Sequence, residues 1–362
     1  MTEKIINDRP LLRTVWPAVP ILLAGIMITL LLLIASDQSP LVAYNALWDG
    51  AFGSSDRTYS TLAFWVPLLL CATGLLVTFT AGLWNIGVEG QMIMGAIGAT
   101  WVALTIALPN PNISSWIILP LEILTGMALG AVWAALAAVL KTRGGVHEIF
   151  GGVALNSLAI IATNYLISGP WQPPEGGSFR GTVPFPDNAM LPLLDPTRFS
   201  PLSLALALIA LGLIVFMLRG THWGLELKAL GKNLRAAFLL GVSSERQAIN
   251  SMMFCGALAG FAGAVRVLSW FDSLRQSISG GIGFLAILIV LLAGFRPLWT
   301  LIIALLFSAL LNGGTFVQSR TQLHSALSGI IQGVLVLFVL LFGDYSRLFW
   351  RKPTDEHEVA HE

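Results

Sequence analysis

The chain alternates long apolar stretches with short polar ones. Most of the apolar stretches approach the ~20 residues that an α-helix needs to cross the hydrocarbon of a bilayer. Ten such runs lie at 17–35, 60–80, 88–108, 116–140, 148–168, 201–218, 249–270, 280–295, 298–311 and 327–343. This pattern predicts an all-α integral membrane protein with about ten transmembrane helices. The composition agrees, since 11% of the residues are charged, whereas a soluble domain carries about 25%.

The runs divide the chain into a short N-terminal segment (1–16), a membrane domain (17–345) and a C-terminal tail (346–362). The first run follows Lys4, Arg9 and Arg13, as the apolar core of a signal peptide would. Because it exceeds the roughly 7–15 residues of such a core, we expect it to be a retained first helix.

The distribution of Lys and Arg predicts the orientation, because cytoplasmic loops are enriched in both. With both termini inside, 14 cations fall in inner segments: Lys4, Arg9, Arg13, Lys141, Arg143, Arg219, Lys228, Lys232, Arg235, Arg246, Arg296, Arg347, Arg351 and Lys352. Only 5 fall outside: Arg57, Arg180, Arg198, Arg275 and Arg320. The remaining cation, Arg266, is expected near the outer end of its helix, with its side chain reaching toward the headgroups or Asp272.

The polar segment 84–92 opens the third apolar run and contains Asn85, Glu89 and Gln91. A charge at the centre of a membrane helix costs roughly 2.5 to 3.5 kcal/mol, so it normally faces a bundle interior or a water-filled path. Asn85 and Glu89 are four residues apart, which predicts one shared helical face at the mouth of the helix. That face could line a route for a polar solute. The structural alternative is a helix-end charge or a buried interhelical bond.

The fifth run, 148–168, carries further polar residues. Asn156 fits either an interhelical hydrogen bond or a solute contact, whereas Glu148 fits a charge at a helix N-terminus. Two stripes of small residues predict close helix packing in the bundle centre. They are Gly126, Gly130, Ala134 and Ala138, and Gly256, Gly260 and Ala264.

The region 280–311 is predicted to contain broken or re-entrant helices. Gly280, Gly281 and Gly283 open its first run, and Arg296-Pro297 separates it from a short second run. Gly- and Pro-interrupted segments are typical of transporter helices that break beside a pathway. Two tilted spans are the alternative.

Two loops are long enough to carry function. The outer loop 169–200 is rich in proline and aromatic residues, so we expect an ordered but irregular cap on which an extracellular partner could dock. In the inner loop 219–248, Asn233 as N-cap and Gly241 as C-terminal stop predict a short helix over 234–240. Ser244 and Gln247 have the spacing of a capping box for the next span. The loop helix is either an interaction element or a solvated connector.

Three stretches carry a resemblance to a known family. They are T-A-G-L-W-N-I-G-V-E-G-Q-M-I-M-G-A (80–96), L-G-K-N-L-R-A-A-F-L-L-G-V (230–242) with C-G-A-L-A-G-F-A-G-A (255–264), and G-I-G-F-L-A-I-L-I-V-L-L-A-G (281–294) with A-L-L-F-S-A-L-L-N-G-G (304–314). They resemble the membrane permease subunit of bacterial ABC importers for nucleosides and simple sugars. The stretch V-H-E-I-F-G-G-V-A-L-N (146–156) is similar to the nucleoside branch.

The resemblance implies a multi-pass permease of the bacterial cytoplasmic membrane. It would pair with a second permease subunit, similar but non-identical as is common in this family, and with ABC ATPase subunits and an extracytoplasmic solute-binding protein.

The resemblance also implies which residues act. Coupling to the ATPase would involve residues of the inner loop: Gly231, Asn233, Arg235, Ala236, Ala237 and Gly241. The candidate solute path comes instead from the polar residues described above and comprises Asn85, Glu89, Gln91 and Asn156. No G-x-x-x-x-G-K-[ST] motif occurs in the sequence, so ATP and Mg²⁺ would be bound by the partner subunit, and this chain would be a transport subunit without a cofactor rather than an enzyme.

Three other function classes are alternatives to a nucleoside importer. A simple-sugar importer has the same motifs. An ion-coupled secondary transporter could use Glu89 to carry a proton, but it would not need the capped loop helix. An intramembrane enzyme is disfavoured, since His147-Glu148 lacks the second histidine of H-E-x-x-H, and no metal site or nucleic-acid-binding patch is indicated by the sequence.

Overall fold

A computed structural model describes residues 40–174 and 181–321. The expected first and last helices (17–35 and 327–343) and both terminal segments lie outside these residues. The helices are α4 (Pro40–Phe52), α5 (Ser55–Thr80), α6 (Val88–Val102), α7 (Ser115–Thr142), α8 (Glu148–Ser168), α9 (Pro201–Gly220), α10 (His222–Lys232), α11 (Leu234–Leu239), α12 (Ser244–Val265), α13 (Ile282–Leu292) and α14 (Pro297–Thr321). π-Helical turns extend α6 and α12 as η1 (Ala103–Ala107) and η3 (Arg266–Phe271), and a 3₁₀ turn, η2, covers Asp187–Ala189.

The predicted all-α membrane fold is confirmed. Seven helices of the described residues are long and apolar enough to cross a membrane, and an isolated bridge between Gly181 and Arg275 is the extent of β-pairing in this part of the chain. α13 differs, because its 11 residues span only about 16 Å, roughly half of a bilayer's hydrocarbon. The predicted interruption near residue 280 therefore produces a half-length helix, whereas α14 has the length of a full span.

The described residues fall into two compact units, one within 51–312 and one made of 40–50 with 313–321. Within the second unit, α4 packs closely on the end of α14. A Cβ atom at Gly50 would lie 3.0 Å from the Cα atom of Gly313, so the absence of a side chain at Gly50 permits this approach.

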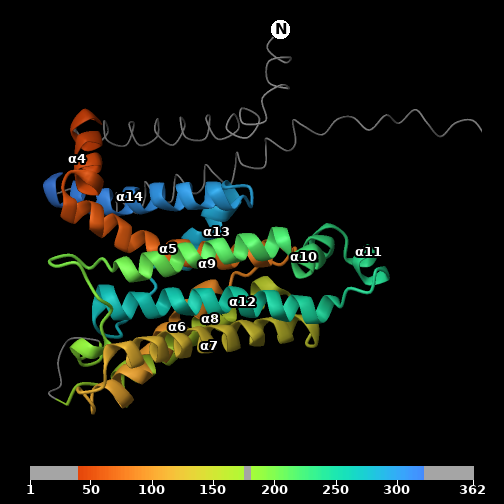
Figure 1. Cartoon of the computed structure of the whole chain (residues 1–362), viewed down its shortest axis with the longest axis horizontal. Coiled ribbons are helices and arrows are strands. Elements are labelled where there is room, and N and C mark those ends of the chain that lie inside the picture. Colours follow the sequence, from red (N-terminus) through yellow and green to blue (C-terminus); the bar gives the residue numbers. More distant parts are fainter. Residues whose placement is uncertain (1–39, 175–180, 322–362) are drawn as a thin grey trace, which may run out of the picture. The chain divides into compact units, whose positions relative to one another are not determined.

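Three helices form the interior of the first unit. The most apolar windows of α5, α6–η1 and α12–η3 are 83%, 72% and 83% buried, against 28% for α7 and 33% for α8. α12 contacts α5, α6 and α7, and Figure 1 shows α12 and α7 running side by side. Small residues make this packing possible, since a Cβ atom at Gly260 would overlap the carbonyl oxygen of Gly126. The two predicted stripes of small residues therefore pack against each other, as expected of helices at the bundle centre.

Loops that the charge pattern assigns to the same side of the membrane lie at the same end of the unit. At one end, Arg143 Nε lies 2.8 Å from Glu245 Oε1, and Lys141 forms an ion pair with Glu148, the first residue of α8. At the other end, the backbone amide of Thr182 donates to the carbonyl of Leu274. The predicted N-terminal helix position of Glu148 is thus confirmed, while the identity of the inner side stays a prediction.

The outer loop is ordered and irregular over its described residues, as predicted. Its backbone pairs with the end of α12–η3 and the segment that follows. The amide of Phe185 donates to the carbonyl of Asp272 at 2.8 Å, and the amide of Leu191 donates to the carbonyl of Leu268 at 3.0 Å. The loop therefore covers one end of the central helix.

The inner loop contains two helices where one was predicted. The predicted helix is α11, in which the side chain of Asn233 accepts from the amide of Ala236 at 3.0 Å, and Gly241 follows its end with φ +81°. The additional helix is α10. The predicted capping box is wrong, because Ser243 is the N-cap of α12 and makes no side-chain cap. The side chain of Gln247 instead contacts α10.

Candidate functional site

The polar segment before α6 lies deeper in the bundle than the sequence predicts. α6 begins at Val88, so Asn85 precedes the helix, and the expected shared helical face of Asn85 and Glu89 is wrong. The amide of Asn85 lies 3.0 Å from the Sγ atom of Cys255, which is the twelfth residue of the continuous helix α12–η3. The start of α6 therefore lies beside the middle of α12–η3 and not at an end of the bundle.

Three predicted path residues are held in hydrogen bonds within the bundle. The side-chain amides of Asn85 and Gln91 bind each other through two bonds of 2.9 Å. Asn156 on α8 accepts from the amide of Gly90 at 2.8 Å and donates to the carbonyl of Ile86 at 3.0 Å. For Asn156, the geometry is that of the interhelical bond. These three amides fix the segment 85–91 between α8 and α12.

Glu89, the fourth predicted path residue, binds the start of α13. Its Oε1 atom accepts from the amide of Gly281 at 2.9 Å, and its Oε2 atom accepts from the amide of Gly283 at 2.7 Å. The first amides of a helix have no partner within the helix and carry a partial positive charge. The carboxylate therefore satisfies the N-terminus of the half-length helix α13, although it is itself only 4% exposed.

Arg266 is buried, in contrast to the predicted position near the headgroups. Its Nε atom donates to the carbonyl of Ile278 at 3.3 Å, and its guanidinium lies over the ring of Phe271, 4.7 Å from the ring centroid. Asp272, the expected alternative partner, pairs with Arg198 and Arg275 instead. The segment 278–283 is thus held by a cation that binds one of its carbonyls and by an anion that binds two of its amides.

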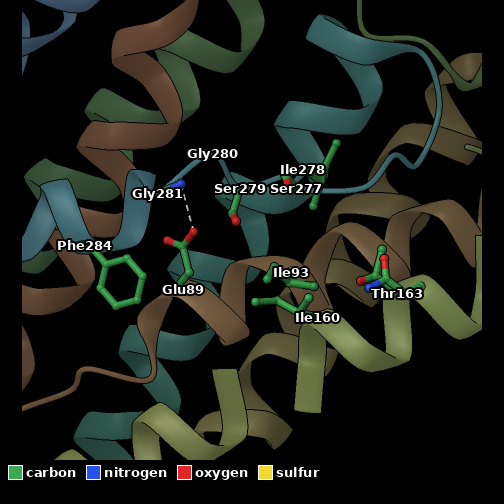
Figure 2. Close-up of a pocket in the computed structure, with 11 residues that line it drawn as sticks. Glu89, Ile93, Ile160, Thr163, Ser277, Ile278, Ser279, Gly280, Gly281 and Phe284 are labelled. Atoms are coloured by element: carbon green, nitrogen blue, oxygen red, sulfur yellow. Dashed lines mark hydrogen bonds between the residues drawn. The ribbon is translucent and has the colours of Figure 1, made fainter. Parts of the chain in front are cut away.

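A cavity of about 300 Å³ lies beside this segment. Its walls come from α6, α8, the turn 277–281 and α13, and Figure 2 shows Glu89 between Phe284 and Ile93. The lining residues are Glu89, Ile93, Ile160, Thr163, Asn164, Ser277, Ile278, Ser279, Gly280, Gly281 and Phe284. Of the four predicted path residues, Glu89 alone lines it. The cavity combines a carboxylate, hydroxyl groups and an amide with an aromatic ring, so it can accommodate a polar, uncharged solute with an apolar face.

No pattern in the sequence marks Ser277, Ser279 or Phe284 as residues of the site. They are far from Glu89 along the chain, so no local motif links them to it. The glycines at 280–283 are the sequence feature that comes nearest to indicating a site here. A second carboxylate, Glu122 on α7, is fully buried, and neither of its oxygens has a hydrogen-bond partner among the described residues. Glu122 does not line the cavity.

The predicted coupling residues divide into exposed and packed positions. Arg235 and Ala236 are exposed, whereas Ala237 is buried. Gly231 packs on the end of α5, since a Cβ atom there would overlap the carbonyl oxygen of Thr80. Asn233 and Gly241 begin and end α11, as described above.

Large apolar side chains are exposed on and directly after α11. Their exposed fractions are 62% for Leu234, 68% for Phe238, and 78% each for Leu239 and Leu240. We call these four residues the α11 patch. A helix of six residues that presents this much apolar surface is typical of a contact with another protein.

A partly buried polar contact joins α10 to α12. The Nε1 atom of Trp223 donates to the Oε1 atom of Gln247 at 2.8 Å, and the Nε2 atom of Gln247 donates to the carboxylate of Glu226. The ring of Trp223 also lies 5.0 Å from that of Phe254 on α12. The loop that carries the α11 patch is therefore fixed to the central helix of the bundle.

Comparison with known proteins adds an independent finding. The sequence model of a family described as branched-chain amino acid transport system, permease component, matches residues 58–340. The chain is 31% identical to the guanosine ABC transporter permease protein NupP of Bacillus subtilis, over 89% of this chain and 92% of that protein.

Two further relatives differ in the solute that their names give. The nucleoside ABC transporter permease protein NupB of Lactococcus lactis is 30% identical over 80% of each chain. The glucose ABC transporter permease protein TsgB13 of Haloferax volcanii is 30% identical over 88% of this chain and 85% of that protein. A second permease protein of the same description, NupQ in Bacillus and NupC in Lactococcus, also matches the chain.

Proposed function

Since this chain belongs to the family of branched-chain amino acid transport system permease components, we propose that it is the translocation subunit of an ATP-driven importer for nucleosides in the bacterial cytoplasmic membrane. Its similarity to guanosine and nucleoside permease proteins over most of both chains carries this proposal. The second candidate is a simple-sugar importer, which the similarity to a glucose permease protein favours.

ATP and Mg²⁺ would be bound by a cytoplasmic ATPase subunit, because this sequence lacks the phosphate-binding motif. The α11 patch supports this assignment. Its apolar surface, in a loop that the charge pattern places in the cytoplasm, would seat in a cleft of the ATPase. Closure of the ATPases on ATP would then move α10 and α12 as rigid bodies and change the side to which the bundle opens.

Two further partners complete the proposed transporter. A second permease subunit is supported by the pairs of relatives in Bacillus and Lactococcus. An extracytoplasmic solute-binding protein would deliver the nucleoside to the outer face, where residues 181–200 of the outer loop offer an ordered surface.

Glu89 would contact the solute along its path. It is the carboxylate that lines the cavity, and a carboxylate accepts hydrogen bonds from sugar hydroxyls that are stronger than neutral ones. Asn85, Gln91 and Asn156 would position the segment that carries Glu89.

The proposal is tested by uptake into proteoliposomes that contain the complete transporter. Labelled guanosine should accumulate with ATP on the ATPase side, and an uncoupler that dissipates ion gradients should not reduce the uptake. Accumulation that depends on an ion gradient and not on ATP would indicate a secondary transporter. ATP-driven uptake of glucose but not of guanosine would favour the second candidate.

A further inference from the structure

The cavity beside Glu89 has two chemically different walls. One wall is the turn 277–281, with the hydroxyl groups of Ser277 and Ser279. The opposite wall contains the apolar side chains Ile93 and Ile160. Figure 2 shows the ring of Phe284 at one end of the cavity and Thr163 at the other.

The hydroxyl groups of the turn are not used by the protein itself. Neither Ser277 nor Ser279 makes a side-chain hydrogen bond in the part of the chain that the structure describes, and Ser279 is only 4% exposed. Because Ser279 lines the cavity, its hydroxyl can bind a molecule there in place of a protein group. Ser279 therefore offers both a donor and acceptors to a molecule in the cavity.

Glu89 is held rigidly and still has acceptor capacity. Each of its oxygens accepts one backbone hydrogen bond, whereas a carboxylate oxygen can accept two. The unused lone pairs can accept from a hydroxyl of a solute without movement of the side chain. At the far end, Thr163 donates its hydroxyl proton to the carbonyl of Ala159 at 3.0 Å, so its oxygen can act as an acceptor.

The backbone of the turn has an unusual conformation. Ser277, Gly280 and Gly281 have φ values of +58°, +58° and +79°, and the value is unfavourable for a serine. Such conformations persist where the surrounding structure holds them and are common at ligand-binding sites. Arg266 and Glu89 supply that support here, through Ile278 and through Gly281 and Gly283.

Phe284 adds a flat apolar surface next to the polar groups. Its side chain is 44% exposed and lies in the first turn of α13, the half-length helix whose N-terminus binds Glu89. An aromatic ring offers a stacking surface for a planar heterocycle, and stacked rings attract each other beyond the contribution of their buried area.

We propose that this cavity is a nucleoside-binding station on the transport path. The ribose hydroxyls bind Glu89 and Ser279, and the base stacks on Phe284. This inference rests on the proposed function and adds to it the residues that recognise the solute. It also assigns the selectivity for a nucleoside over a hexose to Phe284, because a hexose has the hydroxyl groups but no planar base.

The test is photolabelling of the nucleotide-free complex in nanodiscs with 8-azidoadenosine, followed by mass spectrometry. Label is expected on peptides that contain 160–164 or 277–284, and excess guanosine should abolish it while glucose should not. Phe284→Leu is expected to reduce the labelling about two- to twelvefold, given the stacking contribution. Phe216→Leu is the matched control, since Phe216 is 65% exposed on α9 and does not line the cavity.

Ser279→Ala provides a second variant, which removes one hydroxyl with the least change in packing. It should also weaken labelling, and basal ATP hydrolysis by the complex shows whether each variant is assembled. Label elsewhere in the chain, with ATP-driven guanosine uptake intact, would overturn the station and leave the proposed function standing. Equal competition by glucose would overturn the role of Phe284, and absence of any nucleoside uptake would overturn the proposed function itself.

Discussion

The Oε2 atom of Glu89 lies 2.7 Å from the backbone nitrogen of Gly283. The contact joins the first turn of α6 to the first turn of α13, which are separated by almost 200 residues. It places a negative charge at the positive end of a half-length helix, an arrangement that stabilises by about 0.3–2 kcal/mol. A movement of α13 would therefore displace the carboxylate that lines the cavity.

The first prediction concerns the glycine of this pair. A Cβ atom at Gly283 would lie 2.6 Å from Glu89 Oε2 and 2.8 Å from its Cα atom, so Gly283→Ala should force the two helices apart. We expect a loss of about 1–3 kcal/mol in stability, as is usual for overpacking, together with reduced uptake. Thermal unfolding in detergent measures the former. Gly212→Ala on α9 is the control, because its Cβ atom would meet nothing within 4 Å, and an equal effect of both changes would argue against the close contact.

The second prediction concerns the α11 patch. Ala236 is exposed in the middle of α11, so Ala236→Glu should place a charge in the proposed ATPase contact without disturbing the bundle. Uptake and co-purification of the ATPase should both fall, while membrane insertion stays normal. Ala236→Ser adds no charge and should retain both activities. Wild-type uptake and association in Ala236→Glu would show that α11 is only a connector.

The third prediction concerns the contact between α10 and α12. Gln247→Leu removes the hydrogen bonds to Trp223 and Glu226. The carboxylate of Glu226 then lacks the amide donor of Gln247. We expect ATP hydrolysis to continue with less solute transported for each ATP, since motion of the loop is no longer passed to α12. Ser244→Ala is the control, because Ser244 does not cap α12. An unchanged ratio of transport to hydrolysis in Gln247→Leu would remove this contact from the coupling route.

The fourth prediction concerns the orientation of the chain. Single cysteines at Ser178, which lies outside the described residues, and at Ser243 should react with an impermeant reagent from opposite sides, Ser178 from outside. The background needs Cys71→Ala and Cys255→Ser, the latter because serine can still accept from Asn85, whose amide contacts Cys255. Labelling of both positions from one side would contradict the predicted topology and the cytoplasmic position of α11.

Local signals in the sequence predicted the elements that depend on neighbouring residues. The capping of α11 by Asn233 is one example, since its side chain binds the amide of Ala236, only three residues along the chain. The stripes that contain Gly126 and Gly260 also predicted close helix packing, because small residues in membrane helices let backbones approach. That the two stripes pack against each other is shown only by the structure. The apolar runs similarly predicted the helices, as each must satisfy its backbone hydrogen bonds internally.

The position of Asn85 shows where local reasoning fails. Its spacing from Glu89 matches a helical repeat, but Gly82, with φ +73°, follows the end of α5, and the chain then continues non-helically to Val88. Gln247 matched a capping box, yet its amide binds α10, a contact between elements that the local pattern does not encode. The cavity depends on residues of α6, α8 and α13 that meet only through tertiary packing.

The variant Glu89→Gln tests whether the solute passes along the cavity beside Glu89. The variant keeps the size of the side chain, removes the charge and leaves one acceptor oxygen for two backbone amides. We expect a stability loss of about 1–2 kcal/mol and a larger fall in guanosine uptake than this loss explains. Glu122→Gln should not reduce uptake, since the oxygens of Glu122 have no partner among the described residues.

The measurement is the initial rate of ATP-driven guanosine uptake for each assembled complex, taken well below the melting temperature of every variant. We predict a reduced uptake rate for Glu89→Gln and a wild-type uptake rate for Glu122→Gln. A wild-type rate in Glu89→Gln, or a reduction that disappears once the rate is corrected for the fraction of folded complex, would contradict this prediction.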